Sequence, residues 1–268
     1  MPHPPRHRLF AAVVTLVALL LAGGCSGNVG TTEPSGTAPT GTDGTGRDPG
    51  TTEEPSVPAA PEADGVIAQI PARQWQRMVA TGVWRPGCPV GRKELRRVEI
   101  NHHTFDGEVK RGVLVVNRDV ARSVVRIFTR LYEAQFPIRK MRPVELYGGD
   151  VNASLRDDNT SAYNCRRLSQ INAPVLESPH ANGRAVDINP WENPWKDLRC
   201  DCWIPNRKNR VREPGPGVIL KGGLVWRAFS SEGWIWQNID VPDYMHFDTG
   251  YPSQPYRGAR QRSGEGGQ

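Results

Sequence analysis

The stretch Glu94–Gln135, ELRRVEINHHTFDGEVKRGVLVVNRDVARSVVRIFTRLYEAQ, decides the fold class. Residues 94–100 partly alternate apolar and polar side chains, which predicts a β-strand. Residues 113–116 are a second β-type run. The Phe-Asp-Gly sequence at 105–107, between the two runs, is typical of a turn. Together these features predict a β-hairpin.

A helix is predicted directly after this hairpin. Asn117 is suited to cap its first turn, in which Asp119 would lie. Phe136-Pro137-Ile138 ends the helix after about Gln135. Apolar residues recur through this segment at helical spacing: Val120, Val124, Val125, Ile127, Phe128, Leu131 and Tyr132.

Shorter elements follow along the chain. Residues 144–147, 185–188 and 245–249 are predicted strands, and residues 224–231, with glycines on both sides, are a predicted helix. Strands and helices are mixed without regular βαβ alternation. The predicted fold class is therefore α+β, a small antiparallel sheet with flanking helices.

The N-terminal residues predict export. A basic start is followed by the apolar run Leu9–Leu21, which is shorter than the roughly 20 residues of a bilayer-spanning helix. Small residues follow, so residues 1–24 are predicted to be a signal peptide. Leu21-Ala-Gly-Gly-Cys25 resembles the bacterial lipoprotein signal, in which the cysteine becomes the lipidated first residue. We expect a lipid anchor at Cys25, on the outer face of the cytoplasmic membrane; the alternative is ordinary cleavage with Cys25 incidental.

Composition divides the rest of the chain. Residues 25–62 comprise Cys25 and a Gly-, Thr- and Pro-rich stretch with hardly any large apolar side chain, so they are predicted to be a flexible tether. Residues 258–268 are predicted to be a disordered tail for the same reason. Residues 63–257 remain as one globular domain of ordinary size, which we expect to be a monomer.

The charge is mildly basic, with 34 Lys and Arg against 28 Asp and Glu. The excess is small and spread along the chain, so nucleic acid is not an expected partner. It is compatible with an anionic cell-wall polymer.

Four cysteines lie in the globular domain, and export makes disulfides plausible. Four cysteines allow three pairings. We favour Cys88 with Cys165, which would tie the start of the domain to the region of the predicted site. Cys200 and Cys202 would then close a small ring of their own or bind metal; a CxC pair alone is incomplete as a zinc site.

Two segments contain the residues expected to carry chemistry, SPHANGRAVD at 178–187 and DYMHFD at 243–248. His180, Asp187 and His246 offer two imidazoles and one carboxylate. Zn²⁺ commonly takes such ligands, and catalytic zinc sites use three protein ligands plus water. We therefore predict a zinc site on these three residues.

Asp243 is the predicted catalytic base. It lies three residues before His246, close enough for a turn to bring its carboxylate near a metal-bound water, from which it would take a proton. Asp248 is the alternative base. Residues 246 and 248 share a strand face, so Asp248 is equally suited to support the His246 ligand.

The pattern HxxxxxxD followed by DxxH resembles the D-Ala-D-Ala carboxypeptidase and dipeptidase family of zinc peptidases. That family also includes phage L-alanyl-D-glutamate endopeptidases and the vancomycin-resistance dipeptidases. The resemblance runs from about Trp84 to Phe247, including residues 85–89 and 158–166. It implies an α+β zinc-peptidase core of the LAS/Hedgehog type. The zinc ligands that it implies are His180, Asp187 and His246.

The resemblance also implies roles for three further residues. Asp243 would be the catalytic base, where many carboxypeptidase members carry Glu and endopeptidase members often carry Asp. The family usually has an Arg shortly after a Ser-Gly-Tyr/Phe step; here Ser-Ala-Tyr at 161–163 is followed by Asn164, and Arg166 is the candidate to contact substrate and stabilise the oxyanion. Arg166 could instead pair with a structural carboxylate. Ser178 is a candidate to hydrogen-bond a substrate carboxylate or to cap its loop.

Other candidates receive structural interpretations. His102 and His103 are expected to be surface residues at a strand end. Trp191, Trp195 and Trp203 could form a lid or a sugar-stacking surface, but a loop packed on its own small core is favoured.

The predicted function is zinc-dependent hydrolysis of D-amino-acid-containing peptides of peptidoglycan, of the D-Ala-D-Ala carboxypeptidase type. One alternative is an endopeptidase of the L-Ala-D-Glu type. Another is a non-catalytic wall-binding lipoprotein that keeps zinc for stability. The sequence does not choose the bond that is cut.

Overall fold

The computed structural model describes residues 62–166, 176–237 and 240–258. The predicted signal peptide, Cys25 and all but the last residue of the tether lie outside the described residues. So does the tail beyond Gly258, and the predictions made for these parts stay predictions. Within the described residues, no helix combines the length and apolar character needed to cross a bilayer.

The predicted hairpin is the largest part of an antiparallel sheet. Strand β2, Leu95–His103, pairs with β3, Val109–Asn117, and β1, Val66–Ala68, adds to the other edge of β2. Both hairpin strands are longer than expected. They extend to the turn at 105–107, where Gly107 adopts a φ of 79°.

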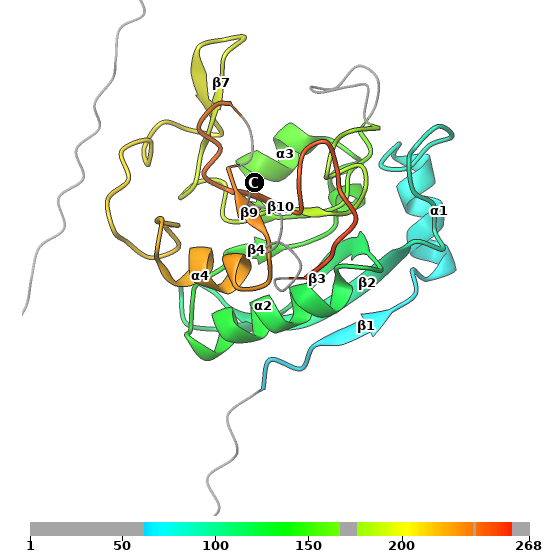
Figure 1. Ribbon diagram of the computed structural model, residues 1–268, viewed down its shortest axis with the longest axis horizontal. Helices are drawn as coiled ribbons and strands as arrows, with labels where there is room; N and C mark the ends of the chain where they lie inside the picture. Colours follow the sequence, from blue (N-terminus) through cyan, green and yellow to red (C-terminus); the bar gives the residue numbers. More distant parts are fainter. Residues whose placement is uncertain (1–61, 167–175, 238–239, 259–268) are drawn as a thin grey trace, which may run out of the picture. The chain divides into compact units, whose positions relative to one another are not determined.

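Helix α2, Ala121–Glu133, confirms the predicted amphipathic helix. It runs along β2 with α4, Leu224–Ser230, packed beside it (Figure 1). The capping prediction was wrong, because Val120 and not Asn117 precedes the first helical residue. Asn117 is instead the last residue of β3, where its amide donates to the Asn182 carbonyl at 3.0 Å. Its side chain therefore joins the hairpin to the loop that carries His180.

A second antiparallel sheet has the order β6-β10-β9. Strands β9 and β10 lie next to each other in Figure 1. Strand β6 is Ala185–Asp187, β10 is His246–Asp248 and β9 is Ile235–Trp236, so the strands predicted near 185 and 245 are confirmed. Phe247 turns toward the core and stacks on Phe229 of α4, with ring centroids 4.0 Å apart. The neighbouring positions of β10 therefore present their side chains on the opposite face.

The strand predicted at 144–147 was wrong. These residues form a short 3₁₀ helix, η1, which follows Pro143 and ends at Gly148, where φ is 64°. Proline fixes φ and lacks an N–H, so it favours the start of a helical turn over a strand in a ladder. The sheet pairing occurs on either side of η1, between β4, Lys140–Met141, and β5, Asn159–Thr160, which is a parallel pair.

Strands β1, β4, β5 and β9 had not been predicted from the sequence, and four other short elements were also missed. These four are α1, Ala72–Ala80; α3, Val151–Arg156; β7, Trp195–Asp197; and β8, Cys202–Ile204. Strands β7 and β8 pair as an antiparallel hairpin. The fold as a whole is the expected mixture of helices with small, mostly antiparallel sheets.

Two disulfide bonds lie within the domain. Cys88 bonds to Cys165, the favoured pairing, and Cys200 bonds to Cys202. The first bridge lies in a buried cluster with Met78, Val83 and Tyr163. The second lies at the tip of the β7–β8 hairpin.

His102 does not lie at the surface. Strand β2 continues past it, and its side chain falls on the inward face that Val98 and Ile100 also occupy, where it is 4% exposed. Burial lowers the pKa of His102. His103, on the other face, is half-buried and stacks on Tyr132 at 4.5 Å.

Candidate metal centre

Strand pairing places two of the predicted ligands side by side. His246 of β10 lies directly opposite Asp187 of β6 in the antiparallel register. Opposed residues in such a pair present their side chains on the same face, about 5 Å apart. Two residues along, Asp248 faces Ala185. The small Ala185 side chain therefore leaves room for a carboxylate beside His246.

A tight turn brings in the third ligand. Gly183 has a φ of 68°, and a Cβ there would lie 2.6 Å from the backbone nitrogen of Asn117. Its carbonyl accepts that same N–H at 2.7 Å. The backbone of His180 is held from the other side, because the Asn164 N–H donates to its carbonyl at 3.2 Å. The loop is thus pinned against β3 and against the chain that leaves β5.

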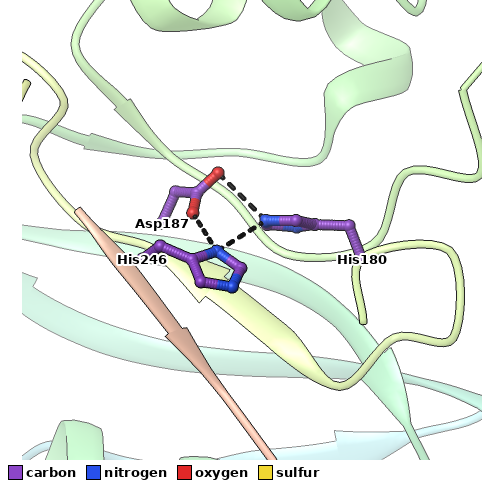
Figure 2. A group of neighbouring side chains, drawn as sticks. All are labelled: His180, Asp187 and His246. Atoms are coloured by element: carbon purple, nitrogen blue, oxygen red, sulfur yellow. Dashed lines mark hydrogen bonds and ion pairs between the residues drawn. The ribbon is translucent and has the colours of Figure 1, made fainter. Parts of the chain in front are cut away.

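Three ligand atoms converge from these segments (Figure 2). His180 Nε2 lies 3.1 Å from His246 Nδ1 and 3.2 Å from Asp187 Oδ2. His246 Nδ1 lies 3.0 Å from Asp187 Oδ1. The residues are only 6%, 8% and 5% exposed for His180, Asp187 and His246. A tetrahedral zinc with bonds of about 2.0–2.1 Å would separate its ligand atoms by about 3.3 Å, so the spacing fits such an ion.

Each imidazole has one ring nitrogen that points toward the other ligands and one outer nitrogen that points away from them. The partner of the outer nitrogen shows whether the inner nitrogen carries a lone pair. His180 Nδ1 lies 2.7 Å from the Ala162 carbonyl, and His246 Nε2 lies 3.0 Å from Asp248 Oδ2. Both partners accept hydrogen bonds, so both outer nitrogens carry the hydrogen in the neutral rings. Two lone pairs and a carboxylate then face one another in a buried space. Such an arrangement requires a positive charge at its centre, either a proton or a metal ion.

The electrostatics point the same way. Burial alone would lower the pKa of His246, but hydrogen bonds to Asp187 and Asp248 raise it well above the ordinary value. Burial alone would raise the pKa of Asp187, but the charge of His180 and hydrogen bonds from both histidines lower it. The carboxylates therefore favour positive charge at this position, as a divalent cation would supply.

Asp243 lies beside this cluster. The His246 N–H donates to the Asp243 carbonyl at 3.2 Å, which is the turn expected from their spacing. Asp243 Oδ1 is buried and has no hydrogen-bond partner among the described residues. Burial raises the pKa of Asp243 to about 7, with His246 opposing that change and Asp187 adding to it. Its position is secured by β7, since Trp195 forms a β-bridge with it.

Arg166 faces the same acids. Burial lowers its pKa, and the charges of Asp187 and Asp243 oppose the change. Its backbone is in the left-handed region, with a φ of 60°, which is uncommon for a residue other than glycine. The Asn164 side chain accepts from its N–H at 2.9 Å, and the preceding residue is Cys165 of the disulfide. The covalent bridge and this hydrogen bond therefore hold a strained residue at the candidate site.

Ser178 lies in the same turn as His180, where its carbonyl accepts from the N–H and the side-chain amide of Asn182. These contacts use only the backbone of Ser178, so both roles of its hydroxyl, capping the loop and contacting substrate, stay predictions. The Ala162 carbonyl was missed by sequence reasoning. No side-chain pattern marks a backbone acceptor, although Ala162 lies in the Ser-Ala-Tyr step.

The centre thus combines two buried imidazoles, one carboxylate, a neighbouring acid and a half-buried arginine. Residues 172–249 match a family model described as D-alanyl-D-alanine carboxypeptidase. No curated protein and no solved structure gives a match. The matched residues include all three candidate ligands and Asp243, which supports a D-Ala-D-Ala carboxypeptidase-like peptidase.

Proposed function

We propose that this protein is a zinc-dependent peptidase that hydrolyses D-amino-acid-containing peptides of peptidoglycan. The observation that carries the proposal is the inward-facing set of two imidazole lone pairs and one carboxylate, with both outer ring nitrogens already bonded. The family match supplies independent support for peptide hydrolysis. We favour D-Ala-D-Ala carboxypeptidase activity within this class.

His180, Asp187 and His246 would hold the metal. Nitrogen and oxygen ligands in a set of three are typical of catalytic zinc. When bound, zinc supplies Lewis acidity toward a carbonyl and lowers the pKa of a water molecule to about 7.

The chain's own residues would complete the reaction. Asp243 accepts a proton from the attacking water and returns a proton to the leaving amine, so that the amide C–N bond breaks into a carboxylic acid and an amine. Within the described part of the chain, Asp243 Oδ1 has no hydrogen-bond partner, so it could accept a proton without first giving up a hydrogen bond. Arg166 stabilises negative charge on the carbonyl oxygen, an effect typically worth a few kcal/mol at the transition state.

The cellular setting is part of the proposal. A lipid anchor at Cys25 and a tether over residues 25–62 would hold a monomeric domain at the outer face of the cytoplasmic membrane, next to its peptidoglycan substrate. Globomycin treatment of expressing cells, followed by mass spectrometry, tests this part. Accumulation of a form that retains residues 1–24 is expected; unchanged processing would contradict lipidation.

The activity is tested by incubating the metal-loaded protein with muropeptides of different stem length and resolving the products by mass spectrometry. Removal of one C-terminal D-Ala from pentapeptide stems, abolished by chelation and restored by zinc, is expected. Cleavage between L-Ala and D-Glu would instead establish the endopeptidase alternative. Unchanged muropeptides with loaded metal would contradict a peptidase acting on these substrates.

Replacing the base separates an enzyme from a wall-binding protein. We expect Asp243→Ala to reduce kcat by about 10²–10⁴-fold, because proton transfer by a positioned acid contributes about that much. Asp243→Glu should retain part of the activity, since it keeps the carboxylate. Metal content and muropeptide affinity are measured alongside and should persist in Asp243→Ala. Equal turnover by the wild type and the Ala variant would remove Asp243 from the mechanism.

A further inference from the structure

A pocket of about 540 Å³ is lined by none of the metal-centre residues. Its lining comes from four separate parts of the chain and includes Arg139, Arg156, Trp191, Glu192 and Lys208. Its volume lies within the range of pockets that bind small molecules. Trp191 follows Asp187 by only four residues, so the chain leads from the metal centre directly to this pocket.

A buried carboxylate organises the pocket wall. Asp158 is fully buried; its Oδ1 accepts the backbone N–H of Trp191 at 2.8 Å, and its Oδ2 accepts from Arg139 Nε at 2.7 Å. The Arg139 guanidinium lies 4.2 Å from the ring centre of Phe105 and 5.8 Å from that of Trp191. Arg139 and Trp191 are therefore held in fixed relative positions.

Trp191 is oriented but left uncovered. Its indole N–H donates to the Arg156 carbonyl at 3.0 Å, and its own carbonyl accepts from the Asn209 amide at 2.9 Å. Even so, the residue is 43% exposed. Trp203 differs, because it stacks on Tyr244 with ring centres 5.6 Å apart. The favoured packed-loop interpretation therefore describes Trp203, while Trp191 offers an aromatic face at the pocket.

The polar lining combines cations with one unsatisfied acceptor. The lining contains three cations, Arg139, Arg156 and Lys208, and one carboxylate, that of Glu192. Arg139 is also paired with the buried Asp158, and Arg156 lies 3.9 Å from Asp150. Glu192 Oε1 accepts from Arg139 at 3.3 Å, whereas its Oε2 is buried and has no hydrogen-bond partner among the described residues. Glu192 as a whole is 9% exposed. A ligand that donates a hydroxyl to Oε2 and brings a negative charge to the cations would complement this lining.

We propose that this pocket binds a saccharide that carries a carboxylate. The sugar ring lies on the face of Trp191, its carboxylate lies near Arg156 and Lys208, and a ring hydroxyl donates to Glu192. Indole faces suit the apolar faces of sugar rings, and guanidinium groups bind carboxylates with directed hydrogen bonds. This inference goes beyond the proposed peptidase activity and does not require a metal.

The test follows the indole N–H resonance of Trp191 by NMR while the protein is titrated with N-acetylmuramic acid. N-acetylglucosamine, which lacks the carboxylate-bearing lactyl group, is the matched neutral sugar. We expect saturable shifts with the acidic sugar and at least about tenfold weaker binding of the neutral one, since paired charges are lost. Inorganic phosphate in place of sugar tests for charge alone.

Variants assign the contacts by calorimetry. Trp191→Ala should weaken N-acetylmuramic acid binding by about tenfold or more, as expected for an aromatic anchor, while Trp191→Tyr should retain most of it. The double variant Arg156→Ala/Lys208→Ala should reduce the acidic sugar to the affinity of the neutral one. Lys221→Ala, an exposed lysine outside the pocket lining, is the control and should change nothing.

Three results would overturn the proposal. The first is no saturable sugar binding by the wild type, and the second is binding of N-acetylmuramic acid by the double cation variant as tight as by Trp191→Tyr. The third is phosphate binding as tight as that of the acidic sugar. Each titration is repeated on metal-depleted protein. If the metal-depleted protein binds the sugar but the metal-loaded protein has no peptidase activity, only the proposed function is rejected. If the metal-loaded protein cleaves peptides but no sugar binds, only the proposal for this pocket is rejected.

Discussion

Each imidazole of the candidate centre is oriented by one acceptor, and the two acceptors differ in kind. His180 uses the backbone carbonyl of Ala162, which no side-chain substitution removes directly. His246 uses Asp248, whose other carboxylate oxygen accepts from the Gly250 N–H at 2.7 Å. At the scale of single residues, Asp248 is therefore the point at which ligand orientation can be changed by mutation.

Replacing Asp248 should weaken metal binding in a graded manner. We expect Asp248→Ala to lower zinc affinity by about 10–100-fold, because the acceptor that orients the His246 ring is lost. Asp248→Asn keeps an acceptor oxygen and should lie between the Ala variant and the wild type. Competition with a chromogenic chelator measures the affinities, and Asp157→Asn, an acid outside the centre, is the control. Unchanged affinity in Asp248→Ala would contradict the supporting role.

Gly183 is a second position where one residue matters. We expect Gly183→Ala to destabilise the domain by about 2–4 kcal/mol, because the left-handed backbone disfavours a Cβ and the added atom meets the backbone of Asn117. Gly107→Ala is a matched control, since φ is 79° there but nothing lies within 4 Å of the added carbon. It should cost about 1–2 kcal/mol. Urea unfolding measures both, and equal losses would show that the contact is relieved by small shifts.

At the scale of elements, the centre depends on the β6–β10 ladder and on a disulfide. The ladder places His246 opposite Asp187. Ser161, in the chain after β5, also pairs with Asp187, because the backbone N–H of each residue donates to the carbonyl of the other. That chain ends at Cys165, whose bond to Cys88 spans 77 residues of sequence. The bridge therefore anchors the segment that carries Ala162 and Arg166.

The two disulfides should contribute very differently to stability. In the chain-entropy model the loop closed by Cys88 and Cys165 is worth about 4 kcal/mol, whereas the one closed by Cys200 and Cys202 is worth about 1–2 kcal/mol. We expect Cys88→Ala/Cys165→Ala to lower the free energy of unfolding by the larger amount and also to reduce activity through Arg166. Cys200→Ala/Cys202→Ala is the comparison. Similar losses in the two double variants would contradict this ranking.

At the scale of the whole domain, buried charge joins segments that are distant in sequence. Asp158, Glu192 and Arg139 meet from three parts of the chain. Burial raises the pKa of Glu192 to about 7, and the charge of Asp158 adds to the effect. A raised carboxyl pKa favours the folded state at low pH, and that contribution is lost as the pH rises from about 4.5 to about 7.

Glu192→Gln should therefore stabilise the domain at high pH only. The Gln side chain cannot ionise, so relative to wild type it should gain up to about 3 kcal/mol between pH 4.5 and pH 8, at about 1.4 kcal/mol for each pKa unit. Urea unfolding at several pH values measures this difference. Glu213→Gln, at an exposed position, should track the wild type at every pH. A pH-independent difference for Glu192→Gln would mean that Glu192 titrates normally.

Local patterns predicted much of the fold and the identity of the candidate site residues. Alternation identified β2 and helical spacing identified α2, because each of these elements buries one face along most of its length, and the glycines on both sides marked α4. The missed strand β7 is only three residues long, which leaves almost no alternation to detect. Helix α1 was missed although it is amphipathic, and it buries only Met78. Two predictions were wrong for reasons that local patterns do not show. The Asn117 amide donates to a distant loop and does not cap α2. Pro143 begins a 3₁₀ helix where the apolar residues of 144–147 had suggested a strand.

The sequence by itself determined the fold class, the chemistry of the three candidate ligands and their order along the chain, since residue type and spacing are local properties. The tertiary structure alone decided which ring nitrogens face inward, that Asp248 supports His246, and that His102 is buried. These features depend on strand register and on backbone acceptors far away in sequence. The same holds for the pocket at Trp191, whose walls come from four segments that only folding brings together.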